Sequence, residues 1–484
     1  MELGKMELKK NILYSGFLTT SLYIFQFITY PYVTRVLGVT NIGICNYVQS
    51  IVQYFCLFSM LGITSLGVRE IAKCNGDKLK LNQTFSRLFT LNAIFTSVAL
   101  VIYFLLIETI PNFTQYRKLL YIGATQIFFG TFTVEWLFRG LEEFKYITIR
   151  TLFVRLIYVI SIFLFVSESD DYIIYFLIYS AMIIANGIIN WNYGKQFVKF
   201  SFQPLSSIKC YVKPLIFLGS QLILTSLYTT FNTVYLGIVC GDTQVGYYTT
   251  ATKIENIILA LYSSFTLVMM PRISSLMESE QQEDIKRMLQ SSFNLLFAFV
   301  FPCIFFSEFY ANELVYLVAG NGYEGAILPM RIVMPLMLIV GLEQILIVQI
   351  LMPSRSDRQV FINSVIGATC SILLNVLLVS KLESVGSSIV WFISELAVMT
   401  TALYFVKQKY YDVEFFANMI KHLLSFMPIL LIYYLISKTV EQDWIGFSLG
   451  FILTLVYSHI SLLYVVKNNV YITFVKSLIL KYKK

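Results

Sequence analysis

Charged residues are scarce in this sequence. They make up 13% of its 484 residues, whereas about 25% is usual in soluble globular proteins. Hydrophobic residues account for 57% of the chain, and a water-soluble fold of this length could not cover its surface with so few charges. The composition excludes a soluble enzyme, a nucleic-acid-binding domain and a disordered chain. It also excludes an outer-membrane barrel, whose strands alternate polar and apolar residues, and it leaves an all-α polytopic membrane protein.

Histidine and paired cysteine are also scarce. The only histidines are His422 and His459, and none of the seven cysteines forms a Cys-x-x-Cys pair. Metal centres and disulfide frameworks need clusters of these residues at short spacings. We therefore expect no metal site and no organic cofactor.

Long apolar runs dominate the sequence instead. One membrane-spanning helix needs about 20 residues, so the chain has room for about fourteen such helices joined by short connections. Glycine or proline marks several of their ends, as at Gly38 and Pro353. The predicted spans are residues 12–34, 42–66, 88–107, 119–138, 147–166, 172–193, 214–238, 245–270, 290–310, 327–351, 360–380, 385–406, 421–438 and 445–466.

Basic residues gather on one predicted side of the membrane. Of the 36 Lys and Arg residues, 28 lie in or beside alternate segments that include both termini, and five lie in the loops between. Because cytoplasmic loops of membrane proteins carry the excess of Lys and Arg, both termini are predicted to be cytoplasmic. The net charge of +8 is thus a property of topology, and we expect no nucleic-acid partner.

An internal repeat joins the two halves of the chain. Gly43 and Arg69 recur as Gly246 and Arg272, each 203 residues later, and Leu37-Gly38-Val39 has a counterpart in Leu236-Gly237-Ile238. Six spans separate the copies, so both face the same way and form a parallel repeat. The predicted organisation is two six-helix lobes followed by two further helices: an N-lobe (1–200), a C-lobe (201–410) and a C-terminal part with a basic cytoplasmic tail (411–484).

Three stretches of the chain resemble bacterial polysaccharide flippases of the Wzx type, within the multidrug/oligosaccharidyl-lipid/polysaccharide exporter superfamily. They are RVLGVTNIGICNYVQSIVQYF continuing to GVREIAK (35–73), VEWLFRGLEEFKYITIR (134–150), and QVGYYTTATKIENI through PRISSL (244–276) followed by QILMPSRS (349–356). The resemblance implies a transporter of the bacterial cytoplasmic membrane. Such a protein moves undecaprenyl-diphosphate-linked oligosaccharides to the outer leaflet for O-antigen, capsule or exopolysaccharide assembly, and polymerase and chain-length proteins are candidate partners.

Two other functions stay open at this stage. An exporter of drugs or metabolites would share the superfamily and the helical architecture. A polysaccharide polymerase or ligase would also use polyprenyl-linked sugars, but it would be expected to carry a large outside loop with basic catalytic residues, and the outside loops here are short. The lipid-linked peptidoglycan-precursor exporter is expected to have arginines deep in its first helix, where this chain has Gln26.

Charged residues inside spans are costly and are functional candidates by default. A diphosphate needs cations, and Lys253 stands eight residues into its span, about 12 Å below the outer interface. Each candidate could instead be a paired, structural charge. The candidates for diphosphate and sugar binding are Lys253, Arg35, Arg155, Arg331, Gln26, Asn46, Gln49, Gln53, Glu135 and Trp136.

A second group of charges suits gating or coupling. Arg69 and Arg272 stand at matching inner ends of two spans, where topological anchoring is the alternative role. The carboxylates Glu255, Glu343 and Glu395 are predicted to lie within spans, and each could bind a coupling Na⁺ or H⁺ or serve as a paired structural group.

Overall fold

A computed structural model describes residues 2–74, 76–279, 281–409, 415–468, 470–473 and 475 of the chain. Every regular element among these residues is a helix, which confirms the all-α class. The end of the predicted basic tail, residues 476–484, lies outside the described residues. Internal contacts divide the chain into unit 1 (Met1–Thr249) and unit 2 (Thr250–Lys484).

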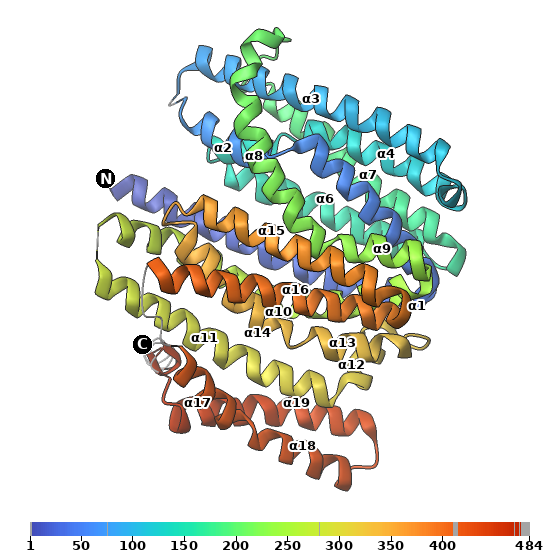
Figure 1. The fold of residues 1–484 in the computed structure, drawn as a ribbon, viewed down its shortest axis with the longest axis vertical. Helices are drawn as coiled ribbons and strands as arrows, with labels where there is room; N and C mark the ends of the chain where they lie inside the picture. Colours follow the sequence, from blue (N-terminus) through green and yellow to red (C-terminus); the bar gives the residue numbers. More distant parts are fainter. Residues whose placement is uncertain are drawn as a thin grey trace. The chain divides into compact units, whose positions relative to one another are not determined.

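Unit 1 begins with a long helix, bent within its length, and continues through shorter ones (Figure 1). Helix α4 packs against α7, and α1 packs against α3 and α6. The elements are α1 (Glu2–Met60), α2 (Ile63–Ala72), α3 (Lys78–Thr109), η1 (Pro111–Tyr116), α4 (Arg117–Gly130), η2 (Thr131–Thr133), α5 (Glu135–Gly140), α6 (Phe144–Phe165), η3 (Ser169–Asp171), α7 (Tyr172–Gly194), α8 (Leu205–Thr229), α9 (Phe231–Cys240) and the first turns of α10 (Asp242–Glu278).

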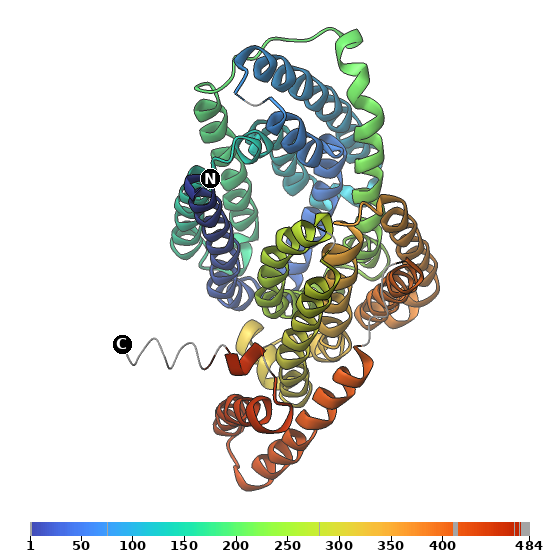
Figure 2. The same cartoon turned by 90° about the vertical axis from the view of Figure 1, so that its left-hand side faces the viewer.

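Unit 2 contains the rest of α10 and ends in the antiparallel pair α18 and α19, which lie side by side (Figures 1 and 2). Helices α15 and α16 pack together, as do α14 and α16. The elements are α11 (Gln282–Phe309), α12 (Ala311–Ala319), η4 (Glu324–Ala326), α13 (Ile327–Val333), α14 (Leu336–Glu343), η5 (Gln344–Leu351), α15 (Asp357–Leu374), η6 (Asn375–Val379), α16 (Ser380–Lys409), α17 (Phe416–Phe426), α18 (Pro428–Thr439), α19 (Asp443–Ile460) and η7 (Ser461–Val465).

Nine helices of the described part of the chain are long and apolar enough to cross a membrane, and a bent pair (Glu324–Val333 with Leu336–Leu351) makes a tenth. Two of the nine, Ile24–Ala72 and Asp357–Gln408, are 49 and 52 residues long, about twice what one crossing needs. Each is broken, at Gly38 and at Glu383, where φ turns positive. The two remaining predicted spans coincide with the more polar helices α4–α5 and α10, so the helices accommodate about fourteen crossings.

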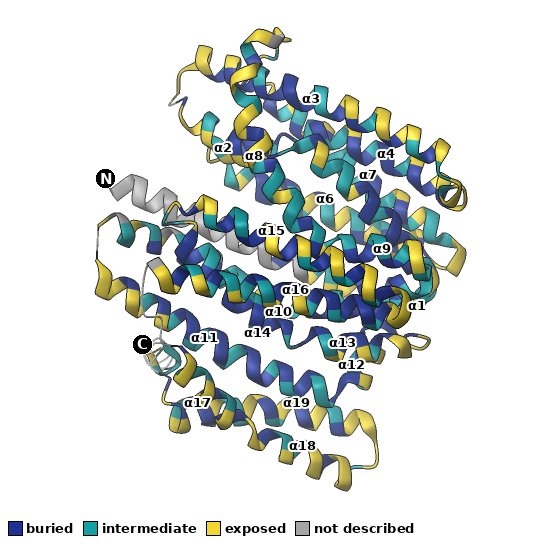
Figure 3. Ribbon diagram, viewed as in Figure 1, coloured by how far each residue is buried: buried dark blue, intermediate teal, exposed yellow. Residues whose placement is uncertain are grey.

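The outer surfaces of these helices are apolar. Large hydrophobic side chains such as Phe153 and Leu164 on α6 and Leu431 on α18 are more than half exposed. Figure 3 shows buried and half-buried residues along α11 beyond its first turns, whereas α18 and α19 carry many exposed residues. Since a helix satisfies its own backbone hydrogen bonds, it can present such a surface to lipid without leaving polar groups unpaired.

The two copies of the repeat contact each other inside unit 1, where α1 crosses the start of α10. A Cβ added at Gly43 would lie 1.8 Å from the backbone oxygen of Asp242, and one added at Gly246 would lie 2.2 Å from the backbone oxygen of Val39. Both glycines and both oxygens are related by the same offset (246 − 43 = 242 − 39 = 203). Such reciprocal contacts are the mark of a two-fold relation, and they confirm the 203-residue repeat predicted from Gly43 and Gly246.

Two further contacts join positions 203 residues apart. The hydroxyls of Thr40 and Thr243 are 2.9 Å apart, and Asn46 Nδ2 donates to Thr249 Oγ1 at 2.9 Å. One detail of the sequence alignment is wrong. Gly38 (φ 75°, ψ 168°) corresponds to Gly241 (φ 83°, ψ 177°), at the same offset.

The prediction had paired Gly38 with Gly237 because the neighbouring letters agree. Gly237 lies inside α9, where a Cβ would strike the ring of Tyr47. What the two turn glycines share is a left-handed φ, which other residues adopt only at a cost, and this backbone requirement fixes the true alignment.

Gly43→Ala is expected to disrupt this crossing, because the new methyl group would meet backbone rather than a movable side chain. Overpacking of this kind costs about 1–3 kcal/mol. We expect less folded protein by size-exclusion chromatography and a melting temperature several degrees lower in detergent. Gly130→Ala is the matched control, since nothing lies within 4 Å of its added Cβ. Equal melting temperatures for the two variants would contradict the close crossing.

Candidate functional site

The polar residues of α1 find partners within unit 1. Asn46 donates to Thr249 as described, and the side chains of Gln49 and Gln126 exchange hydrogen bonds at 3.1 Å. Gln126 Nε2 also donates to Ser180 Oγ at 2.9 Å. Gln53, the third predicted member of this stripe, is exposed. Asn46 and Gln49 thus join helices as well as supplying polar groups, a common role of amides in membrane proteins.

The first predicted span and its end carry two further candidates, Gln26 and Arg35. Gln26 is half-buried, and Arg35 is exposed. Arg35 Nη1 donates to the backbone oxygen of Pro31 at 2.8 Å. Arg155, on α6, is half-buried with Tyr158 and Tyr179 as electrostatic neighbours.

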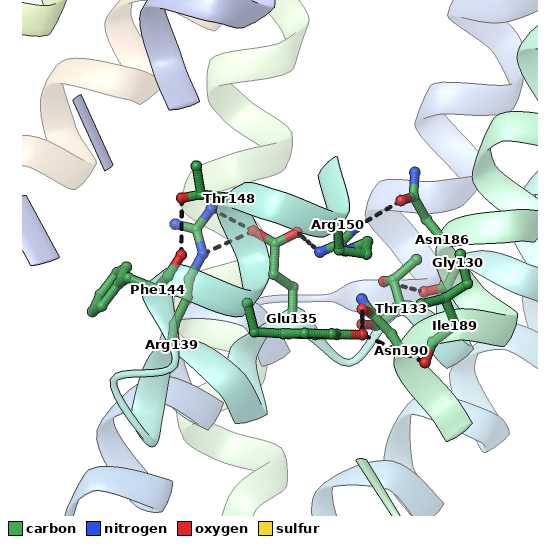
Figure 4. A network of polar contacts seen from close by, with 11 residues as sticks. Gly130, Thr133, Glu135, Arg139, Phe144, Thr148, Arg150, Asn186, Ile189 and Asn190 are labelled. Atoms are coloured by element: carbon green, nitrogen blue, oxygen red, sulfur yellow. Dashed lines mark hydrogen bonds and ion pairs between the residues drawn. The ribbon is translucent and has the colours of Figure 1, made fainter. Parts of the chain in front are cut away.

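Glu135 is the centre of a charged network between α5, α6 and α7 (Figure 4). Its Oε1 accepts from Arg139 Nη2 at 2.8 Å, and its Oε2 lies 3.7 Å from Nη2 of Arg150. Arg139 is half exposed, whereas the side chain of Arg150 is 6% exposed. Glu135 therefore links a solvated arginine to a buried one.

Two asparagines of α7 complete this network. Arg150 Nη1 donates to Asn186 Oδ1 at 2.7 Å, and Tyr146 Oη donates to Asn190 Oδ1 at 2.9 Å. The Nε of Arg150 has no hydrogen-bond partner among the described residues. A buried guanidinium with one carboxylate and one amide is expensive to maintain in a low-dielectric interior, which makes Arg150 a functional candidate.

Trp136 follows Glu135 but faces the core. It is 1% exposed, its ring stacks on Phe85 at 5.5 Å, and a Cβ at Gly67 would touch it at 2.6 Å. Its faces are closed to a sugar in this conformation. Arg69 and Arg272, the predicted gate residues, are both exposed, Arg69 in the last turn of α2 and Arg272 within α10.

The three predicted coupling carboxylates gather in unit 2. Glu255 comes from α10, Glu343 from α14 and Glu395 from α16, and they are 1%, 8% and 4% exposed. Glu343 and Glu395 are within hydrogen-bonding reach of each other, and Glu255 is an electrostatic neighbour of Glu395. We call these three residues the carboxylate cluster.

The carboxylate cluster has few donors. Trp391 Nε1 donates to Glu395 Oε1 at 2.8 Å, but both oxygens of Glu255 and Oε1 of Glu343 have no hydrogen-bond partner in the described part of the chain. A hydrogen bond between two carboxyl groups exists only when one of them carries a proton. This arrangement is therefore able to hold and release a proton.

Two predicted cations belong to unit 2. Lys253 is half-buried on α10, two residues before Glu255, and Arg331 is exposed on α13. Arg331 has Glu308 and Glu313 as electrostatic neighbours. Across the described residues, no three Asp, Glu, His or Cys side chains converge closely enough to hold a metal ion.

Outside the spans, Asp242 ties the repeat contact to the loop before α4. Both of its carboxylate oxygens accept from Tyr116 Oη, at 2.8 and 2.9 Å. Burial raises the pKa of Asp242, and the Tyr116 hydrogen bond partly offsets this shift by stabilising the ionised form.

Sequence reasoning missed several of these residues. Arg150 closes one of the singled-out stretches, yet Arg155 was chosen as the deep arginine of that helix. Asn186 and Asn190 on the next predicted helix were the available signal, because polar side chains on neighbouring helices can pair. That signal depends on α6 packing against α7, which the sequence alone does not show. Gln126 and Ser180 were missed for the same reason.

Comparison with known families gives one match. Residues 8–277, more than half of the chain, match the profile of a family described as polysaccharide biosynthesis protein. A protein of Escherichia coli (strain K12) named for O-antigen transport is 25% identical over 421 residues, covering 84% of this chain and 98% of its own length. A protein of Shigella dysenteriae with the same name is 24% identical over 58% of this chain and 70% of its own length.

Solved structures share the fold. The lipid II flippase MurJ, in an inward closed conformation, superposes with a TM-score of 0.72 over 96% of this chain and 99% of its own, at 12% identity. An inward-facing multidrug resistance transporter of the MATE family, in the MOP superfamily, gives a TM-score of 0.62 over 82% of this chain and 100% of its own, at 11% identity.

Glu135→Gln is expected to destabilise the protein more than Arg139→Gln does. The first change leaves the buried Arg150 without a carboxylate, which costs about 3–5 kcal/mol. The second removes an exposed pair worth about 0–1 kcal/mol. Thermal denaturation in detergent measures both, and Glu135→Gln combined with Arg150→Met should recover most of the lost stability. Equal effects of the two single variants would contradict the central position of Glu135.

Proposed function

The chain belongs to the polysaccharide biosynthesis protein family, and from this premise we propose that it is a flippase for undecaprenyl-diphosphate-linked oligosaccharides. It moves the repeat unit from the inner to the outer leaflet of the bacterial cytoplasmic membrane for assembly of a surface polysaccharide. The observation that carries the proposal is the match to a relative named for O-antigen transport along 98% of that relative's length. The chain is a multi-pass membrane transporter and not an enzyme, as its family indicates.

The chemistry of the substrate explains why a carrier is needed. A sugar diphosphate has charges and hydroxyls that would lose their hydrogen bonds in hydrocarbon, at several kcal/mol for each unsatisfied group. A carrier must offer polar partners and admit the substrate from one side at a time. The fold shared with a lipid II flippase over 96% of this chain supports movement by alternating access.

We assign the diphosphate to cations and the sugars to polar groups, as the sequence predicted. Lys253 is the main candidate for the diphosphate, and Gln53 supplies an exposed amide on α1. Arg69 and Arg272 stay candidates for the inner gate, since both are exposed. Polymerase and chain-length proteins that use the flipped unit are the candidate partners.

Export of drugs or metabolites is the second candidate function. The MATE-family transporter whose fold covers 82% of this chain favours it. The two functions differ in what accumulates when the protein is absent. A flippase deficit leaves lipid-linked sugar units in the inner leaflet, whereas an exporter deficit raises the cytoplasmic level of a soluble compound.

The carboxylate cluster supports a proton as the coupling ion. The pair formed by Glu343 and Glu395 needs one proton for its hydrogen bond, and Glu255 lies beside it without a donor. A sodium ion would need several oxygens at coordination distance from one point, and the described acidic side chains do not form a group that could hold a metal ion. Proton movement through this cluster would give unit 2 two charge states and so two preferred packings.

A strain that lacks this gene is expected to accumulate the lipid-linked repeat unit, because synthesis continues while translocation stops. Mass spectrometry of extracted lipids measures the pool, and a plasmid copy of the wild-type chain should return it to the parental level. A normal lipid-linked pool together with a raised cytoplasmic level of a small cationic compound would replace the flippase with the exporter.

Glu343→Gln and Glu395→Gln are expected to lower surface polysaccharide at least about tenfold without lowering protein abundance, because a glutamine cannot carry the proton. In proteoliposomes each variant should lose the dependence of transport on a pH gradient. Glu283→Gln, which changes an exposed carboxylate in the first turn of α11, is the matched control. Unchanged gradient dependence in both variants would exclude the cluster from coupling.

A further inference from the structure

A pocket of about 470 Å³ opens at one end of unit 2, among α12, η4, α13 and the start of α19. This volume is within the range of pockets that hold small ligands. The charge distribution predicts that this end faces the outside of the cell. The lining residues are Asn312, Glu313, Val315, Tyr316, Gly320, Glu324, Ile327, Asp443 and Trp444.

An aromatic pair forms one wall of the pocket. Tyr316 of α12 and Trp444 of α19 have ring centroids 5.6 Å apart at an angle of 52°. The two side chains are 44% and 43% exposed, so the rest of the protein leaves much of their ring surface accessible. Open aromatic faces beside polar groups suit a ligand with an apolar face and a hydroxylated rim.

Three carboxylates and one amide form the rest of the polar lining. Burial raises the pKa of Glu313, and the negative charge of Asp443 adds to this shift, while Arg331 opposes it. The backbone N–H of Gly322 donates to Glu324 Oε1 at 3.1 Å and holds that side chain at the rim. The three carboxylates come from three different elements, α12, η4 and α19.

We propose that this pocket binds a sugar ring that is neutral or bears an amine, and that the ring belongs to the translocated oligosaccharide. The C–H face of a pyranose packs on Trp444 and Tyr316, and its hydroxyls donate to the carboxylates and share hydrogen bonds with Asn312. The second part of the proposal rests on the proposed flippase function.

The electrostatics of the pocket decide the class of sugar. Three carboxylates line the pocket, and Arg331 is an electrostatic neighbour of one of them, Glu313, so an ammonium group on the ring gains charge-assisted hydrogen bonds. A uronic acid or a phosphate meets like charge and is disfavoured. The site is thus chemically distinct from any site for the diphosphate, which needs cations.

Binding is tested on the purified full-length protein in detergent by saturation-transfer NMR with three probes: methyl glycosides of glucosamine, glucose and glucuronic acid. We expect saturable binding with a Kd on the order of 1–10 mM for glucosamine, weaker binding of glucose, and none of glucuronic acid. Trp444→Ala should raise the Kd for both bound probes about five- to tenfold. Tyr464→Ala is the control, since it removes an exposed ring at the other end of the same helical segment.

The carboxylates have a separate readout. Glu313→Gln together with Asp443→Asn should abolish the preference for glucosamine over glucose while glucose still binds. Several results would overturn the site: no saturable binding to folded wild-type protein, equal affinity in Trp444→Ala, or preference for the glucuronide. Circular dichroism of each variant shows whether a loss of binding reflects misfolding, and in that case Trp444→Phe, which keeps an aromatic face, replaces Trp444→Ala.

The two proposals fail separately. If the deletion strain accumulates lipid-linked units but the protein binds no glycoside, the pocket assignment is wrong and the flippase function stands. If the protein binds glycosides but the deletion strain has a normal lipid-linked pool, the pocket binds sugar, and its assignment to a translocated oligosaccharide is wrong.

Discussion

Polar groups of this chain must find their partners within the chain, because lipid offers none. The backbone meets this requirement by forming helices in every regular element of the described residues. The side chains meet it in pairs, as in the reciprocal hydrogen bonds of Gln49 and Gln126. A buried polar group without a partner is therefore informative, since keeping it unpaired costs free energy, and it becomes a candidate for a functional role.

Buried charges need partners within the chain even more than neutral polar groups do. Glu135 pairs with Arg150 in the interior of unit 1, and Asn186 of α7 accepts a hydrogen bond from the same guanidinium. In unit 2 the balance is reversed, because carboxylates outnumber donors around Glu395. One unit thus carries a network in which the buried arginine has a carboxylate partner, which suits a rigid frame. The other carries a cluster whose charge depends on protons, which suits a moving part.

Much of this architecture could be predicted from sequence. Apolar runs predict the helices, and the equal offset of Gly43 and Gly246 predicts the repeat, because close packing at that point tolerates no side chain. The partners of single residues could not be predicted. Glu343 and Glu395 were both recognised as membrane carboxylates, but their contact depends on how α14 packs against α16. The pocket with Trp444 is lined by residues from 312–327 and from 443–444, which lie more than a hundred residues apart in the sequence. No local sequence pattern predicts that these segments come together. Gly38 was aligned with the wrong glycine because matching letters do not reveal a left-handed φ.

The reciprocal crossing of Gly43 and Gly246 has a consequence for the history of the chain. A contact in which each copy offers the same surface to the other is the contact that two identical subunits make in a symmetric dimer. A six-helix ancestor could have associated through this surface before its gene was duplicated and fused. After such a fusion the two copies can diverge, while the crossing still requires a glycine in each copy. The repeat offset places Glu255 opposite Val52 of the first copy (255 − 203 = 52), so a buried carboxylate in the second copy stands where the first copy has an apolar residue.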